Sequence, residues 1–133
     1  MADLESSRMD VQADVVLVDR VGVLGDLYSI ADLAYVGGGW GTAGLHSVLE
    51  PAAFGTPVLF GPRHANAREA GELVACGGAF AVASEKALRE RIDHLWRDAD
   101  ARGAAGRAAG AYVEAGRGAA QRGAELVRDL AGL

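Results

Sequence analysis

Two glycine-marked segments carry side chains that could bind an anion and a sugar. The first segment, residues 37–46, contains Gly44 and His46 and leads into a predicted helix that begins near Ser47. Glycine lets the backbone approach a ligand closely, and a helix N-terminus offers free N–H groups to a phosphate. Glu50 follows one turn later, and a carboxylate can accept hydrogen bonds from both hydroxyls of a ribose. Together these residues predict a nucleotide site.

The second segment, residues 61–66, adds three possible contacts to a phosphate or a sugar. These are Arg63, His64 and Asn66. Each of them also has a structural interpretation, because the two basic residues could form a solvated face. Asn66 is well placed to cap a helix that starts at Ala67.

The residues of the first segment have structural interpretations as well. Ser47-x-x-Glu50 has the spacing of a capping box, in which the acid bonds back to the helix start. Trp40 could cover a base or could fill space left by a missing partner strand. The segment lacks the lysine of a P-loop, and taken alone the pattern is a weak signal.

The elements that must position these residues alternate between strands and helices. Short apolar runs predict strands at 15–19, 33–36, 57–60 and 79–82. Helical spacing or capping signals predict helices over 24–31, from Ser47 to Gly55, over 67–76, after Ser84, and over 101–133 with a frayed middle. This alternation predicts an α/β fold with a parallel sheet, in which ligands bind beyond the carboxyl ends of the strands.

The composition limits the class of protein. The chain has 133 residues, which is one domain or part of one, and a net charge of −5, which argues against binding nucleic acid. One cysteine excludes a disulfide framework and a multi-cysteine zinc site. The sequence has no apolar run of membrane-spanning length, and its acidic, polar first fourteen residues are unlike a signal peptide, so we expect a soluble cytoplasmic domain.

Four sequence blocks resemble the C-terminal, donor-binding domain of the bacterial 3-deoxy-D-manno-octulosonic acid (Kdo) transferases. They are V-V-L-V-D at 15–19, A-D-L-A-Y-V-G-G at 31–38, L-E-P-A-A-F-G-T-P-V-L-F-G-P at 49–62 and N-A-R-E at 66–69. The resemblance implies part of a GT-B glycosyltransferase: a partial Rossmann-like parallel sheet flanked by helices, followed by C-terminal helices. It divides the chain into a flexible lead-in at 1–14, a partial nucleotide-sugar-binding domain at 15–98 and a helical segment at 99–133.

The same resemblance implies the reaction. Family members transfer Kdo from CMP-Kdo to the lipid A precursor in lipopolysaccharide biosynthesis, at the cytoplasmic face of the inner membrane and without a metal or other cofactor. The CMP phosphate is expected at Gly44, His46 and Ser47, and the ribose is expected at Glu50. The general base is expected in an N-terminal domain, so no catalytic residue is assigned within this chain.

Departures from the family pattern keep two alternatives open. The family's T-M-G-E-L is R-V-G-V-L at 20–24, and the second glycine of its G-G-H-N is Leu45. These changes leave room for another GT-B enzyme that uses a UDP- or GDP-sugar. A non-catalytic remnant that binds no nucleotide is the second alternative.

The short chain gives two further expectations. In the family's sheet, strands that precede this sequence separate 15–19 from 33–36. We therefore expect 33–36, 57–60 and 79–82 to pair in parallel, and 15–19 to be loosely held or to pair abnormally. Without the N-terminal domain, which a complementary polypeptide would have to supply, we expect no transfer activity from this chain alone.

Overall fold

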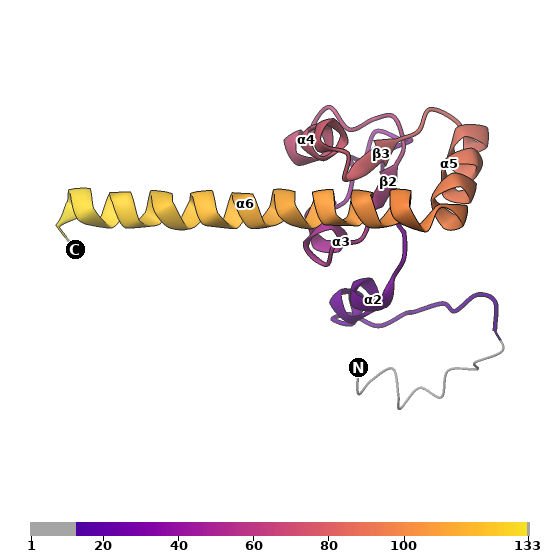
Figure 1. The fold of residues 1–133 in the computed structure, drawn as a ribbon, viewed down its shortest axis with the longest axis horizontal. Helices are drawn as coiled ribbons and strands as arrows, with labels where there is room; N and C mark the ends of the chain where they lie inside the picture. The colour runs from indigo at the N-terminus through magenta and orange to yellow at the C-terminus, as the bar shows by residue number, and fades with distance from the viewer. Residues whose placement is uncertain (1–12, 133) are drawn as a thin grey trace.

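The computed structural model describes residues 13–132, and most of the expected lead-in at 1–14 lies outside this range. Its elements are α2 (Leu24–Ile30), β1 (Ala34–Val36), α3 (Leu49–Ala53), β2 (Val58–Phe60), α4 (Arg68–Cys76), β3 (Ala79–Ala81), α5 (Glu85–Arg97) and α6 (Ala99–Ala131). The strands form one parallel sheet in the order β1-β2-β3, with helices around it (Figure 1). The predicted α/β class and the parallel pairing of these three strands are confirmed.

The core lies around the central strand β2. All three residues of β2 are buried, as expected for a strand that is covered on both faces. Residues from the other strands and from α3, α4 and α6 pack with them: Val36, Val48, Ala52, Ala70, Leu73, Ala79 and Ala109. These contacts fix the end of β1 against the end of β2.

The register of the sheet places the two glycine-marked segments side by side. Val36, the last residue of β1, is level with Phe60, the last residue of β2. Both segments therefore leave the sheet at the same edge, and the amide of Arg63 donates to the carbonyl of Gly39 at 2.8 Å. The expected location of a ligand site, beyond the carboxyl ends of neighbouring strands, follows from this register.

The strand predicted at 15–19 is absent. Residues 15–20 form neither helix nor strand, and the side chains of Val15 and Leu17 are 85% and 90% exposed. An apolar β-branched run becomes a strand only when a neighbouring strand or a packed face supports it. The expectation that this segment would not pair normally is confirmed.

Two predicted helix caps are also wrong. The N-cap of α3 is Val48 and receives no side-chain hydrogen bond, so Ser47 and Glu50 form no capping box. The N-cap of α4 is Ala67, again without a side-chain cap, so Asn66 does not serve there. The predicted cap at Ser84 is confirmed, because its hydroxyl accepts from the Ala87 amide at 3.0 Å.

The C-terminal helix is unbroken, although its glycines predicted a frayed middle. α6 runs for 33 residues, and Figure 1 shows its C-terminal half extending beyond the other elements. Alanine, the best helix former, flanks the glycines and offsets their cost. Within residues 13–132, no helix combines the length and apolar character needed to cross a membrane.

The N-terminal half of α6 is anchored through glycine contacts. A methyl group at Gly106 would overlap the carbonyl oxygen of Gly55, and a Cβ at Gly78 would lie 2.7 Å from the Cα of Ala109. These distances mean that backbone packs directly on backbone at both crossings. Glycine at 106 is therefore required by packing, and this requirement explains its place inside a helix.

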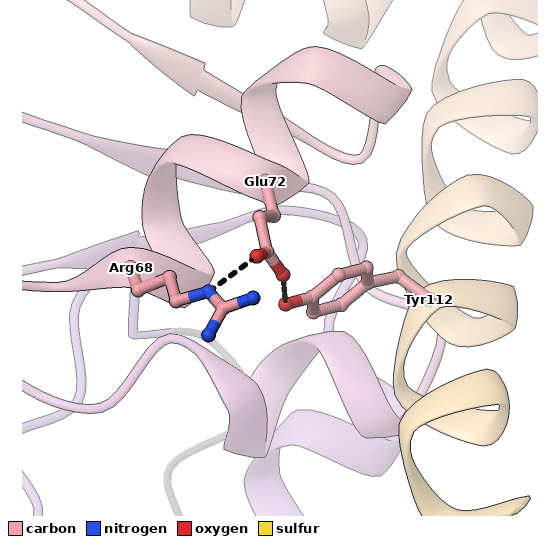
Figure 2. A network of polar contacts seen from close by, with 3 residues as sticks. All are labelled: Arg68, Glu72 and Tyr112. Carbon is pink, nitrogen blue, oxygen red and sulfur yellow. Dashed lines mark hydrogen bonds and ion pairs between the residues drawn. The ribbon is translucent and has the colours of Figure 1, made fainter. Parts of the chain in front are cut away.

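A polar network joins α6 to α4 next to these crossings. The hydroxyl of Tyr112 donates to one carboxylate oxygen of Glu72, and Arg68 pairs with the other at 2.7 Å (Figure 2). The hydrogen bond to Glu72 raises the pKa of Tyr112 to about 12. Hydrogen bonds from Tyr112 and Arg68 lower the pKa of Glu72. We call the sheet and the helices α2 to α5 the body of the fold. The network holds α6 at the point where it extends beyond this body.

We expect Gly106→Ala to destabilise the fold. Alanine favours the helix by up to about 1 kcal/mol, but forced overlap in a packed interior costs about 1–3 kcal/mol. The urea midpoint should fall. In Gly71→Ala, where the new methyl group meets nothing within 4 Å, the midpoint should hold or rise. Equal effects of the two substitutions would contradict the close crossing of α6.

Candidate nucleotide-binding site

A pocket of about 310 Å³ lies beside the end of β1. It is lined by Leu24, Tyr28, Tyr35, Val36, Gly37, His46, Ser47 and Glu50. Three predicted site residues are therefore brought together: His46 from the first glycine-marked segment, Ser47 directly after it and Glu50 from α3. All three are exposed rather than turned into the core.

Backbone hydrogen bonds shape one side of the pocket. The amide of His46 donates to the carbonyl of Gly37 at 3.0 Å, which closes the segment between them into a loop. Gly38 and Gly44 lie inside this loop with φ values of +94° and +95°, a conformation that favours glycine. A Cβ at Gly38 would also overlap the carbonyl oxygen of Gly44. The glycines therefore bring His46 and Ser47 back beside β1.

The opposite side of the pocket is formed by α2. The buried Thr56 donates its hydroxyl hydrogen to the carbonyl oxygen of Tyr28 at 3.2 Å, which fastens α2 to the turn before β2. Tyr28 then lines the pocket together with Glu50. Burial and, to a smaller extent, the negative charge of Glu50 raise the pKa of Tyr28. Tyr28 is thus a neutral hydroxyl at physiological pH, beside a carboxylate that accepts hydrogen bonds.

The loop tryptophan supports the pocket from outside. Trp40 does not line it, but its indole N–H donates to the hydroxyl of Tyr35, which does. Its ring also lies beside Gly61, where a Cβ would be 2.9 Å from the indole. Trp40 therefore fixes Tyr35 and joins the two glycine-marked segments, and neither interpretation from the sequence anticipated this contact.

The remaining predicted residues lie next to this pocket without lining it. The side-chain nitrogen of Asn66 lies against Gly44, 3.2 Å from where a Cβ would be. The His64 ring contacts Phe60 edge-on, with centroids 5.2 Å apart, and so faces the core. Arg63 is exposed on the second segment. Gly44 and Asn66 thus form one neighbouring contact, and His64 has a packing role.

Sequence reasoning missed the contribution of α2 and of the tyrosines. The sequence patterns predict only a helix over 24–31 for Tyr28 and a strand at 33–36 for Tyr35. The available signal was their position. A helix that immediately precedes β1 can place a side chain near the start of α3. β1 is an edge strand, so it pairs with another strand on one side only.

Comparison with known proteins identifies the relatives of the chain. No family model matches it. It is 37% identical over 87 residues to the 3-deoxy-D-manno-octulosonic acid transferase of Aquifex aeolicus, and 32% identical over 120 residues to that of Bordetella pertussis. These alignments cover 65% and 90% of the chain. The chain belongs to the Kdo transferase family.

A solved structure supports the fold. The C-terminal CMP-Kdo binding domain of WaaA from Acinetobacter baumannii aligns with a TM-score of 0.66 and 21% sequence identity. The alignment covers 73% of this chain and 51% of that one. The chain also spans only about a quarter of the length of the curated Kdo transferases it matches.

The position of the Glu50 carboxylate can be tested through Tyr28. With Tyr35 and Tyr112 changed to phenylalanine, Tyr28 is the only tyrosine left, because the chain has three. Adding Glu50→Gln removes a negative charge, so the pKa of Tyr28 should fall. It should stay above 10.0, because burial, the larger cause, remains. Spectrophotometric titration measures it. As the control, adding Glu114→Gln on α6 should leave the pKa of Tyr28 unchanged. If Tyr28 had the same pKa in the Glu50→Gln and Glu114→Gln variants, the Glu50 carboxylate would not lie beside it.

Proposed function

We propose that this chain is the donor-binding part of a Kdo transferase and that the pocket beside β1 binds the CMP half of CMP-Kdo. One observation carries the proposal. His46, Ser47 and Glu50 line the same pocket as Tyr28 and Tyr35, although the two groups lie in different parts of the sequence. The relatives named Kdo transferases and the likeness to a CMP-Kdo binding domain favour this donor over UDP- and GDP-sugars.

In this proposal Glu50 binds the ribose. Its carboxylate is exposed in the pocket and takes part in no capping box, so its oxygens are available for two sugar hydroxyls. Tyr28 lies beside it as a neutral hydroxyl that can donate to the same sugar. The pair offers both an acceptor and a donor, which suits a ligand whose hydroxyls need both.

The phosphate is assigned to the loop side of the pocket. Here we place it near His46, Ser47 and the backbone at Gly44, where the left-handed glycine removes the side chain that would block approach. α3 has only five residues, so its dipole is a minor contribution. Arg63 and Asn66 on the neighbouring segment are the further candidates for contact with the phosphate or the sugar.

Tyr35 is assigned to the base. Rings of Tyr and Trp stack on any nucleobase, and Tyr35 is held by Trp40 at the mouth of the pocket. Charge that develops on departing CMP would be stabilised by the donors around the phosphate. The lipid A precursor and the general base belong, in this proposal, to a separate N-terminal part of the enzyme that works at the cytoplasmic face of the inner membrane.

The proposal is tested by thermal-shift titration of the chain with CMP, UDP and GDP. A ligand at a hundred times its Kd adds about 2.7 kcal/mol of stability, and each kcal/mol raises Tm by roughly 2–8 °C. CMP should raise Tm by several degrees and more than UDP or GDP. Glu50→Ala should abolish the shift.

The matched control is Glu114→Ala, which removes an exposed carboxylate on α6 that does not line the pocket. Its response to CMP should equal that of the unchanged chain. A larger shift with UDP or GDP would support a different nucleotide-sugar enzyme. No shift with any of the three nucleotides would support a remnant that binds no nucleotide.

A further inference from the structure

One face of α6 keeps the same character from Ala105 to Leu130. Its buried residues are Ala105, Gly106 and Ala109, which pack against the body. Steps of seven from these positions give Tyr112, Ala119 and Leu126; Val113, Ala120 and Val127; and Gly116, Gly123 and Leu130. Every member is apolar or glycine. A strict seven-residue repeat is the pattern by which one helix packs along another.

The second half of this face has no cover within the described chain. Every residue from 119 to 132 is exposed, and Leu126, Val127 and Leu130 are 59%, 65% and 79% exposed. Figure 1 shows this part of α6 projecting away from the body. An isolated helical segment of this length is marginal in water, and Gly116, Gly118 and Gly123 weaken it further. Packing by a partner would offset that cost.

A groove lies where the helix leaves the body. Its volume is about 740 Å³, and its apolar lining comes from Leu49, Tyr112, Val113, Gly116, Ala119 and Ala120. We call this the α6 groove. Arg68, Glu69, Glu72 and Arg117 also line it, so the groove carries charges of both signs. The projecting end of α6 also carries charges of both signs, on Arg122, Glu125, Arg128 and Asp129.

We propose that two copies of this chain associate through antiparallel pairing of their α6 helices, with the projecting end of each helix in the α6 groove of the other. In the register set by the repeat, Leu126 lies over Gly116 of the second copy, Leu130 lies beside Tyr112, and Gly123 meets Ala119. Leu126 thus meets a glycine, and the small residues at the centre let the helices approach closely.

The direction of the pairing follows from the position of the body. The body packs on the N-terminal half of α6, so in a parallel pair the two bodies would compete for the same space (Figure 1). In an antiparallel pair they lie at opposite ends. The same surface is then used twice around a two-fold axis, which closes the assembly as a dimer.

Sedimentation of the whole chain at micromolar concentration tests the proposal. The unchanged chain should sediment as a dimer, and Leu126→Lys should sediment as a monomer. Leu126 is exposed in the single chain, so circular dichroism and Tm report whether the variant still folds. Gln121→Lys adds the same charge on the opposite face of α6 and should leave the dimer intact.

Disulfide trapping tests the direction. In a Cys76→Ser background, the pair Gly116→Cys and Leu126→Cys should yield a cross-linked dimer. Ten residues separate the two positions, about 15 Å along one helix, which is too far for a bond within one chain. A monomer at all concentrations, a Leu126→Lys dimer, or cross-linking of Gly116→Cys alone would each overturn the proposal.

Discussion

The direct backbone contact between the two glycine-marked segments is the constraint on which the site depends. A Cβ at Gly39 would lie 2.7 Å from the amide nitrogen of Gly61, so side chains are excluded from both positions. The contact is possible because β1 and β2 end at the same level, and it is closed by the hydrogen bond from Arg63 to Gly39. The first glycine-marked segment can then fold back so that His46 and Ser47 lie beside β1. If the segments were held apart, the pocket would lose that wall.

The same use of small residues explains how the long C-terminal helix joins the body. α6 crosses the fold where Gly106 meets Gly55 and where Ala109 meets Gly78, and each crossing brings backbone against backbone. The network of Tyr112, Glu72 and Arg68 holds the helix at the end of that contact. The face that makes these contacts continues beyond the body. The proposed nucleotide site and the projecting face of α6 are thus separate surfaces, assigned in our proposals to a small ligand and to a second copy of the chain.

Local patterns in the sequence were sufficient to predict three of the strands, their parallel order and the Ser84 cap, because these depend on apolar runs and neighbouring residues. They failed where distant contacts decide the outcome. The apolar run at 15–19 predicted a strand, yet no neighbour supports it. Ser47 and Glu50 have capping-box spacing, but the loop closed by Gly37 and His46 shifts the helix start to Leu49. The glycines of α6 predicted fraying, because the contact that explains Gly106 is with Gly55, which lies far away in the sequence.

The central claim is that the pocket beside β1 holds CMP. The most direct measurement is an NMR titration of the amide resonances of the chain with CMP. The account predicts saturable shifts at Gly37, Gly44, His46, Ser47 and Glu50, with little change along the projecting half of α6. Shifts confined to the α6 groove, or no saturable shift in the first glycine-marked segment, would contradict it.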